Sequence, residues 1–482
     1  MLKKMFSKYN SLPVQVKASM WFLICSVLQK GISTITTPIF TRLLSTTEYG
    51  QFSVFNSWQG IIMVFVTLYL YAGVFMQGLV KFSEERKIFI SSLQGLTLVL
   101  VIAWTGVYLL FRSFWNELFS LTTIQMLSML IIIWLSAVFN FWAASERVNY
   151  NYRKLVILTL TVSVARPLLG IVFVMKADDK VTARILGILI VELLGYGWLF
   201  FKQLKEGKVF FSKKYWKYAL AFNIPLVPHY LSQTILSNSD RIMIEKLLGS
   251  SEAGIYSLAY SIALIMVIIN QALLQTIEPW LYKKIKDKQI MDTSKVVYIS
   301  LIVIALANLL LIIFAPEIIR LFAPPSYRNA IWVIPPVAMS VFFMYMYNMF
   351  ADYEFYFEQK KLIAISTIFS AIINIVLNYV FIGIAGYYAA GYTTLFCYIL
   401  YAICHYIAFR NICSKNFNGN NPYSVKVLVS ITIGFMGLGF LFMFTYNWTL
   451  IRYLMIFIII VICLIRRNAI KNAVTEIIKL RK

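Results

Sequence analysis

The stretch RLLSTTEYGQFSV (42–54) occurs a second time, 204 residues later, as KLLGSSEAGIYSL (246–258). The identical pairs are Leu43/Leu247, Leu44/Leu248, Glu48/Glu252, Gly50/Gly254 and Ser53/Ser257. Ser45 and Glu48 have the spacing of a capping box, which predicts that a helix begins there. Two ungapped copies of one helix start indicate an internal repeat; the alternative is a chance likeness between two amphipathic turns.

Composition places this repeat in a membrane. The chain has 482 residues, of which 60% are hydrophobic and 13% charged, with a mean hydropathy of +0.76. Soluble domains have roughly 45–50% apolar and about 25% charged residues. These values exclude an ordinary soluble enzyme, a secreted disulfide scaffold and a disordered chain. They predict an all-α polytopic membrane protein.

Fourteen segments are apolar enough to be membrane spans, each of which needs ~20 mostly apolar residues. They are residues 18–40, 52–79, 88–111, 124–145, 155–175, 183–201, 219–238, 253–279, 296–315, 330–350, 362–383, 387–409, 427–446 and 448–465. The connections are short, and no G-x-x-x-x-G-K-[ST] motif occurs. The sequence therefore predicts no ATPase module between the spans.

Basic residues predict the orientation. With the N-terminus inside, 32 of the 44 Lys and Arg residues lie on the inner side. The positive-inside rule then places both termini in the cytoplasm, with the basic head as part of an uncleaved first span. Lys202–Lys217, Lys283–Lys295 and the tail Arg466–Lys482 face anionic inner-leaflet lipid. The net charge of +24 is thus explained without nucleic acid.

The repeat and the spans together predict the architecture. Both copies connect the first and second spans of a six-span unit, and because six is even the two units have the same orientation. We expect a six-helix lobe at 1–201, a basic cytoplasmic linker at 202–218, a second lobe at 219–410, and two further helices with a basic tail at 411–482. Paired six-helix units are typical of transporters, whose substrate sites lie near the bilayer midplane between the repeats.

A few charged side chains interrupt the spans, and charges at that depth usually face a cavity or a partner. Lys30 is in the middle of its span, has no acidic neighbour in sequence and is predicted to line a cavity. Arg166 lies next to Pro167, and Glu192 either pairs with Arg166 or stands alone. His229 follows two prolines, which indicates a bent helix; it is a cavity residue or a hydrogen-bonded filler.

Polar residues of the second half have open roles. Asp240 and Arg241 are predicted either to line the cavity or to form an interfacial pair. Asn270 and Gln271 are predicted to bind sugar hydroxyls or to join helices. Lys30, Arg166 and Arg241 would make a shared cavity cationic, which suits a phosphate-bearing substrate.

Metal and catalytic motifs are weak. Asp352-x-Glu354, in the inner loop after residues 330–350, has the pattern of a glycosyltransferase metal motif, but the surrounding aromatic residues favour an interfacial belt. The five cysteines include no C-x-x-C, so neither a zinc site nor a disulfide framework is predicted.

The stretches TPIFTRLLSTTEYGQFSVF (37–55) and SNSDRIMIEKLLGSSEAGIYSLAYS (237–261) resemble the Wzx-type flippases of O-antigen and capsule repeat units. These belong to the multidrug/oligosaccharidyl-lipid/polysaccharide exporter superfamily. The resemblance implies two lobes in a V around a cationic lumen. It also implies movement of an undecaprenyl-diphosphate-linked oligosaccharide from the inner to the outer leaflet of the bacterial plasma membrane by alternating access.

The resemblance extends to lipids and partners. In related flippases the two extra spans form a groove for the lipid tail, and here Gly434, Gly437 and Gly439 would line it, unless they serve tight helix packing. Membrane lipids, a polymerase and a chain-length regulator of the same pathway are the implied partners. No cofactor is expected, and coupling to H⁺ or Na⁺ is left open.

Three other functions compete. A multidrug or cation antiporter of the same fold requires an essential acid, for which Glu192 and Asp240 are the candidates; Lys30 in the first span argues against it. A membrane-embedded polymerase needs a long outer loop or an acidic catalytic pair. A major-facilitator transporter needs a Gly- and Arg-rich loop after its second span, where this chain reads KFSEERK (81–87).

Overall fold

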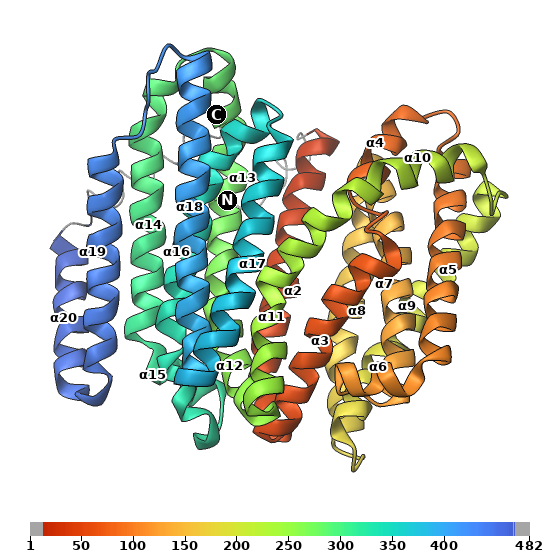
Figure 1. Cartoon of the computed structure of the whole chain (residues 1–482), viewed down its shortest axis with the longest axis horizontal. Coiled ribbons are helices and arrows are strands. Elements are labelled where there is room, and N and C mark those ends of the chain that lie inside the picture. The colour runs from red at the N-terminus through yellow and green to blue at the C-terminus, as the bar shows by residue number, and fades with distance from the viewer. Residues whose placement is uncertain (1–12, 466, 468–482) are drawn as a thin grey trace, which may run out of the picture. The chain divides into compact units, whose positions relative to one another are not determined.

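The predicted all-helical fold is confirmed by a computed structural model, which describes residues 13–465 and residue 467 (Figure 1). The described residues contain no strand, and eleven of their helical segments are long and apolar enough to cross a membrane. The other three predicted spans, 52–79, 219–238 and 448–465, coincide with helices that are broken, shorter or less apolar. The count of fourteen spans therefore stays a prediction.

The chain forms two compact units, Met1–Asn238 and Ser239–Lys482. The division falls within one helix, α11 (Val227–Leu248), whose first half packs with the first unit. The lobe boundary expected from the sequence lies about one helix earlier.

In the first unit, helix α9 is central and packs against α5, α7 and α8, while α2 packs against α8. The elements are α2 (Val14–Leu43), α3 (Thr46–Thr67), α4 (Gly73–Lys81), α5 (Arg86–Leu110), α6 (Arg112–Phe119), α7 (Thr123–Val148), α8 (Tyr152–Val174), α9 (Lys180–Gly207), α10 (Lys213–Asn223), the 3₁₀ turn η1 (Ile224–Leu226) and α11.

Two predicted spans of this unit are broken for identifiable reasons. The segment 52–79 divides into α3 and α4 because Leu68 and Tyr69 adopt positive φ angles of 47° and 52°, which no helix accommodates. The segment that begins at 219 bends at η1, where Pro225 cannot donate a helical hydrogen bond. The predicted bend near His229 is thus present, and Figure 1 shows α10 and α11 running in different directions.

In the second unit, the buried helix α16 is central and packs against α12, α13, α14, α17, α18 and α19. The elements are α12 (Ser250–Ala263), α13 (Ile265–Lys286), η2 (Ile290–Thr293), α14 (Ser294–Ile313), α15 (Ala315–Phe322), η3 (Pro325–Trp332), α16 (Ile334–Tyr356), α17 (Lys360–Ala385), α18 (Tyr388–Asn416), α19 (Val425–Phe444), η4 (Thr445–Asn447) and α20 (Thr449–Ile465). Figure 1 shows α19 and α20 as a hairpin closed at η4.

The repeated segment occupies the same place in both units. Helix α3 begins at Thr46 and α12 at Ser250, positions that correspond under the offset of 204. The predicted capping box is present, because Ser45 and Glu48 exchange side-chain and backbone hydrogen bonds. In the second copy Gly249 is the cap, with a φ of 112° that favours glycine.

Two expected inner-side features look different in the structure, and a third lies outside the described residues. Most of Lys202–Lys217 is helical, because α9 continues to Gly207 and α10 begins at Lys213. Asp352 and Glu354 are not in a loop; they lie buried in the last turns of α16. The basic head, residues 1–12, and the tail after Arg467 lie outside the described residues.

Candidate functional site

A polar cavity of about 520 Å³ lies within the first unit. Helices α2, α3, α7, α8 and α9 contribute its walls, and its lining carries three basic side chains, Lys30, Arg166 and Arg184, against one acid, Glu192. Amide and hydroxyl groups complete the polar wall; they belong to Gln29, Ser33, Thr36, Asn56, Gln59, Ser136 and Ser163. Ligand pockets in proteins commonly have volumes of about 300–1,000 Å³, so the cavity can hold a small polar group.

One face of α2 forms a long side of the cavity. Its lining residues from Gln29 to Phe40 follow helical spacing and cover about 16 Å of helix, roughly half of a bilayer's hydrocarbon thickness. Lys30 is exposed there, and its ammonium forms no ion pair within the described residues. Gln29 is held by a hydrogen bond that its Nε2 donates to Ser163 Oγ of α8, at 3.2 Å.

The Arg166–Glu192 pair that the sequence left open is present. Arg166 Nη2 lies 2.6 Å from Glu192 Oε1, and Glu192 is buried. Ser136 Oγ donates a weak hydrogen bond to the other carboxylate oxygen, at 3.4 Å. Because Arg166 neutralises the carboxylate, the ammonium of Lys30 adds a positive charge to the cavity that no ion pair within the described residues offsets.

Arg184 is a cavity residue that the sequence analysis missed. It lies in the second turn of α9. Its guanidinium carbon lies 3.6 Å from the ring centroids of both Phe40 and Phe52, a cation–π arrangement that orients the planar group. The signal was present in the sequence, since Arg184 falls one residue inside the apolar segment 183–201.

Of the other predicted site residues, His229 belongs to the first unit but does not line this cavity. It is half-buried in α11, its ring is 5.9 Å from that of Tyr230, and its Nδ1 has no hydrogen-bond partner among the described residues.

Asp240 lies in a buried polar cluster of the second unit. Its carboxylate accepts hydrogen bonds from Tyr256 Oη at 2.6 Å, Asn378 Nδ2 at 2.6 Å and Thr394 Oγ1 at 2.8 Å, and only 1% of the residue is exposed. The Arg241 guanidinium lies over the ring of Tyr260, 4.3 Å from its centroid. Asp240 is therefore enclosed by its own unit and does not line the polar cavity of the first unit.

The amides also have distinct places. Asn270 is buried and donates from Nδ2 to the carbonyl of Val341 at 2.9 Å, which joins α13 to α16. Gln271, the next residue, is exposed. The helix-joining alternative thus describes Asn270.

The three glycines of α19 do not share one environment. A Cβ at Gly434 or Gly437 would meet no atom within 4 Å, whereas one at Gly439 would lie 2.4 Å from Met339 Cε of α16. Gly439 therefore serves close helix packing, and only Gly434 and Gly437 lie on an open face of the helix.

A buried pair in α16 and α18 was also missed. His405 Nδ1 lies 2.6 Å from Glu354 Oε1, and both side chains are almost fully buried. This hydrogen-bonded position inside a helix accounts for Glu354, and the described residues contain no group of three or more His, Cys, Asp or Glu arranged to hold a metal.

The fold defines a polytopic helical membrane protein. Its fold matches that of the lipid II flippase MurJ in an inward closed conformation, with a TM-score of 0.67, 16% identity and coverage of 94% of this chain and 100% of that one. It also matches an inward-facing multidrug resistance MATE family transporter of the MOP superfamily, with a TM-score of 0.61, 13% identity and coverage of 81% and 96%.

Residues 16–283 match the family of polysaccharide biosynthesis proteins, and the chain belongs to this family. The resemblance seen in the repeated segments is thereby confirmed. Among curated relatives, Lsg locus putative protein 1 of Haemophilus influenzae is 26% identical over 205 residues, 41% of this chain and about half (51%) of that protein. An uncharacterized membrane protein of the same organism is 23% identical over 374 residues, 74% of this chain and 88% of its own length.

Proposed function

We propose that the protein is a flippase that moves an undecaprenyl-diphosphate-linked oligosaccharide from the inner to the outer leaflet of the bacterial plasma membrane for surface polysaccharide assembly. The observation that carries the proposal is the polar cavity of the first unit, whose lining has three basic side chains and one acid, Glu192; that acid is paired with Arg166, and Lys30 forms no ion pair within the described residues. The family and the fold shared with a lipid II flippase support it.

The chemistry of the cavity suits a diphosphate with sugars attached. Lys and Arg form charge-assisted hydrogen bonds to phosphate oxygens, and Arg does so with two parallel N–H groups. Asn56 and Gln59 offer both donors and acceptors to hydroxyl groups. A polar head cannot cross hydrocarbon unaided, since each unsatisfied polar group costs several kcal/mol. The cavity replaces water for the head while the isoprenoid tail stays in lipid.

The antiporter alternative needs an acid that is available to a cation. Glu192 is engaged by Arg166 at 2.6 Å, and Asp240 is closed in by three hydrogen-bond donors. The two candidate acids are therefore both occupied, which favours an anionic substrate over a cationic drug.

The test is complementation in a host that lacks the gene. We expect wild type and Lys30→Arg to restore surface polysaccharide, and Lys30→Ala to leave lipid-linked repeat units accumulating on the inner leaflet. Loss of one charge-assisted contact of about 1.5–3 kcal/mol slows translocation by one to two orders of magnitude. Lys205→Ala, an exposed lysine in the last turn of α9, is the matched control and retains function.

Other outcomes identify the competing functions. Intact polysaccharide with raised drug sensitivity in the deletion strain contradicts the flippase and indicates the antiporter. Repeat units that reach the outer leaflet but stay unpolymerised contradict it in favour of a polymerase.

A further inference from the structure

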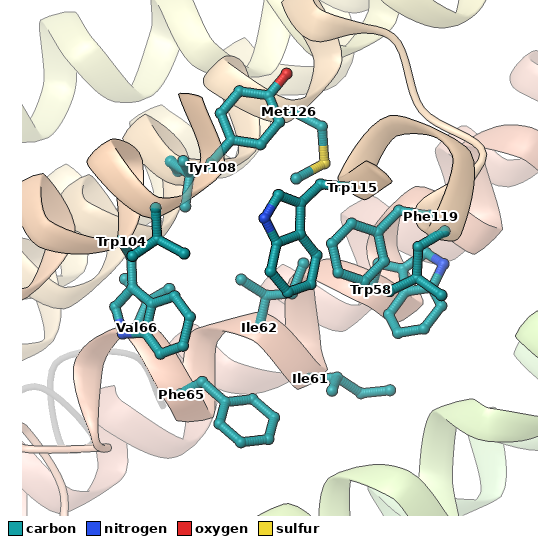
Figure 2. A pocket seen from close by; sticks show the side chains of 13 residues that line it. Trp58, Ile61, Ile62, Phe65, Val66, Trp104, Tyr108, Trp115, Phe119 and Met126 are labelled. Carbon is teal, nitrogen blue, oxygen red and sulfur yellow. The ribbon is translucent and has the colours of Figure 1, made fainter. Parts of the chain in front are cut away.

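A second hollow in the first unit differs from the polar cavity in size and chemistry. It has a volume of about 320 Å³ and lies among α3, α5, α6 and α7 (Figure 2). The side chains that shape it include Trp58, Phe65, Trp104, Val107, Trp115 and Met126. Its lining contains no charged side chain, and its one hydroxyl belongs to Tyr108.

Helix α6 covers this hollow. The ring of Trp115 stacks on that of Phe119 at 5.5 Å, and Phe119 meets Trp58 of α3 edge-on at 4.5 Å. Figure 2 shows Trp115 and Phe119 on one side of the open space and Trp104 on the other. Phe114 of the same helix is 58% exposed.

Polar contacts of Asn116, in the middle of α6, hold this helix against its neighbours. Asn116 accepts a hydrogen bond from Tyr108 Oη and donates one to Thr123 Oγ1, each at 3.0 Å, which ties α6 to α5 and α7. Short helices with an apolar face and aromatic residues are typical of the membrane interface. Because α5 begins at the basic segment Arg86–Lys87, its far end and α6 are on the predicted outer side.

We propose that the hollow binds one acyl chain of a membrane phospholipid. An apolar cavity stays dry, and a hollow of about 150 Å³ holds a six-carbon ring, so this one accommodates on the order of a dozen carbons. That is the length of one acyl chain, whereas a polyisoprenoid tail is several times longer.

The position of the hollow gives the lipid a role. Helix α3 presents Asn56 and Gln59 to the polar cavity, and Trp58 and Ile62 to the hollow. An acyl chain therefore fills the space behind the helix that forms one wall of the polar cavity, and its dispersion contacts hold that wall in place.

The experiment uses the full chain in vesicles of phosphatidylethanolamine and phosphatidylglycerol with a trace of phosphatidylethanolamine that carries a diazirine on one acyl chain. The protein is extracted into detergent, washed and then illuminated, so that only retained lipid forms adducts. We expect adducts on hollow-lining residues such as Trp104, Trp115 and Met126, at several-fold higher yield than on Ile157 of α8, which is 67% exposed. A parallel sample contains a diazirine-bearing polyprenyl phosphate instead.

Two variants of α5 provide the matched comparison. Val107→Trp places an indole in the hollow and is expected to reduce the adducts several-fold. Leu109→Trp adds the same side chain about 200° around the helix, at a residue that is 54% exposed and does not line the hollow, and is expected to leave them unchanged. Each of three results overturns the proposal. The yield of adducts on hollow-lining residues of wild type is no higher than on Ile157, the adducts persist in Val107→Trp, or the polyprenyl probe labels the hollow in preference to the phospholipid probe.

Discussion

Asp240 shows at the scale of one residue how the second unit accommodates a carboxylate. Burial of an ionised carboxylate is costly unless hydrogen bonds replace its water. Here the replacements come from three helices, because Tyr256 belongs to α12, Asn378 to α17 and Thr394 to α18. The carboxylate thus joins parts of the chain that are more than a hundred residues apart in sequence.

We expect Asp240→Asn to destabilise the folded chain by about 1–3 kcal/mol, because the new amide presents a donor where the cluster already supplies donors. The measurement is the melting temperature of the full chain in detergent. Asp287→Asn is the control, since Asp287 is exposed after the end of α13. Equal melting temperatures for the two variants would show that the cluster contributes nothing to stability.

Single residues were predictable where their chemistry conflicted with their surroundings. Lys30 and Arg166 stood out as charges inside apolar segments, and both line the polar cavity. Arg184 did not stand out, because it lies at the edge of a predicted span. His405 did not stand out either, because only the structure shows that it contacts Glu354. A side chain's partner on another helix is decided by packing, which periodicity does not encode.

At the scale of elements, the connection between α9 and α10 packs closely on α5. Ser91 Oγ donates to the carbonyl of Val209 at 2.8 Å, and Trp216 Nε1 to the carbonyl of Ser92 at 2.9 Å. A Cβ at Gly95 would lie 2.1 Å from the carbonyl oxygen of Phe210. Glycine at this position is therefore required by the close approach of backbone, not by helix bending.

Two glycines of α5 give opposite predictions for the same substitution. We expect Gly95→Ala to cost about 1–3 kcal/mol through overpacking. A Cβ at Gly106 would meet nothing within 4 Å, so Gly106→Ala is expected to stabilise α5 by up to about 1 kcal/mol through helix propensity. Melting temperatures of both variants in detergent test this; a fall for both would contradict the open space at Gly106.

The start of α5 carries a pH-dependent contact with α10. Hydrogen bonds from Lys214 and then Tyr215 lower the pKa of Glu85, with Lys214 Nζ 2.7 Å from the carboxylate. A carboxylate with a lowered pKa stabilises the fold above its ordinary pKa of about 4.3 and loses that effect as pH falls through its folded pKa.

We therefore expect the melting temperature of wild type to be higher than that of Glu85→Gln at neutral pH. The difference between the two melting temperatures should vanish at acid pH. The effect is small because the pair is exposed and screened. Exposed Glu206→Gln, outside this contact, controls for general loss of a carboxylate. A difference that grows toward acid pH would have the wrong sign for this contact.

Hydropathy predicted where helices occur, but it did not predict where they are interrupted. Every predicted span coincides with helix in the structure, since apolar runs of that length have few alternatives in lipid. The break between α3 and α4 is at Leu68 and Tyr69, residue types that rarely adopt positive φ. Because neither is Gly or Pro, the sequence did not predict a break at these positions. The short helices α6 and α15 follow the predicted spans 88–111 and 296–315, in connections for which no helix was predicted.

At the scale of the whole molecule, the repeat predicted two helical halves, and the structure has two units. Their division within α11 was not predictable from spacing. The first half of that helix is tied to the first unit by stacking of Tyr230 on Tyr69 at 5.1 Å, and the preceding segment by the hydrogen bond from Asn223 Nδ2 to the carbonyl of Leu68 at 2.8 Å. Such contacts between distant residues determine where a unit ends.

A transporter that moves a diphosphate outward also moves charge, and this gives the last prediction. Outward movement of about two negative charges, with the inside negative, is favoured by about 4.6 kcal/mol at ~100 mV. The membrane potential alone is then sufficient to drive accumulation in the outer leaflet without ATP. In vesicles containing the full chain and a fluorescent polyprenyl-diphosphate oligosaccharide, we expect a potassium diffusion potential of this sign to accelerate flipping and the opposite sign to slow it.

The matched control is the same vesicle with Lys30→Ala, in which the cavity loses one positive charge and flipping at every potential should be slow. The potential acts on the charge that is moved, whereas Lys30 acts on the cavity that holds it, so the two effects are separable. If wild-type flipping is equally fast at both signs of the potential, the rate-limiting step carries no net charge, and the negative charge of the substrate must be balanced by a cation that moves with it.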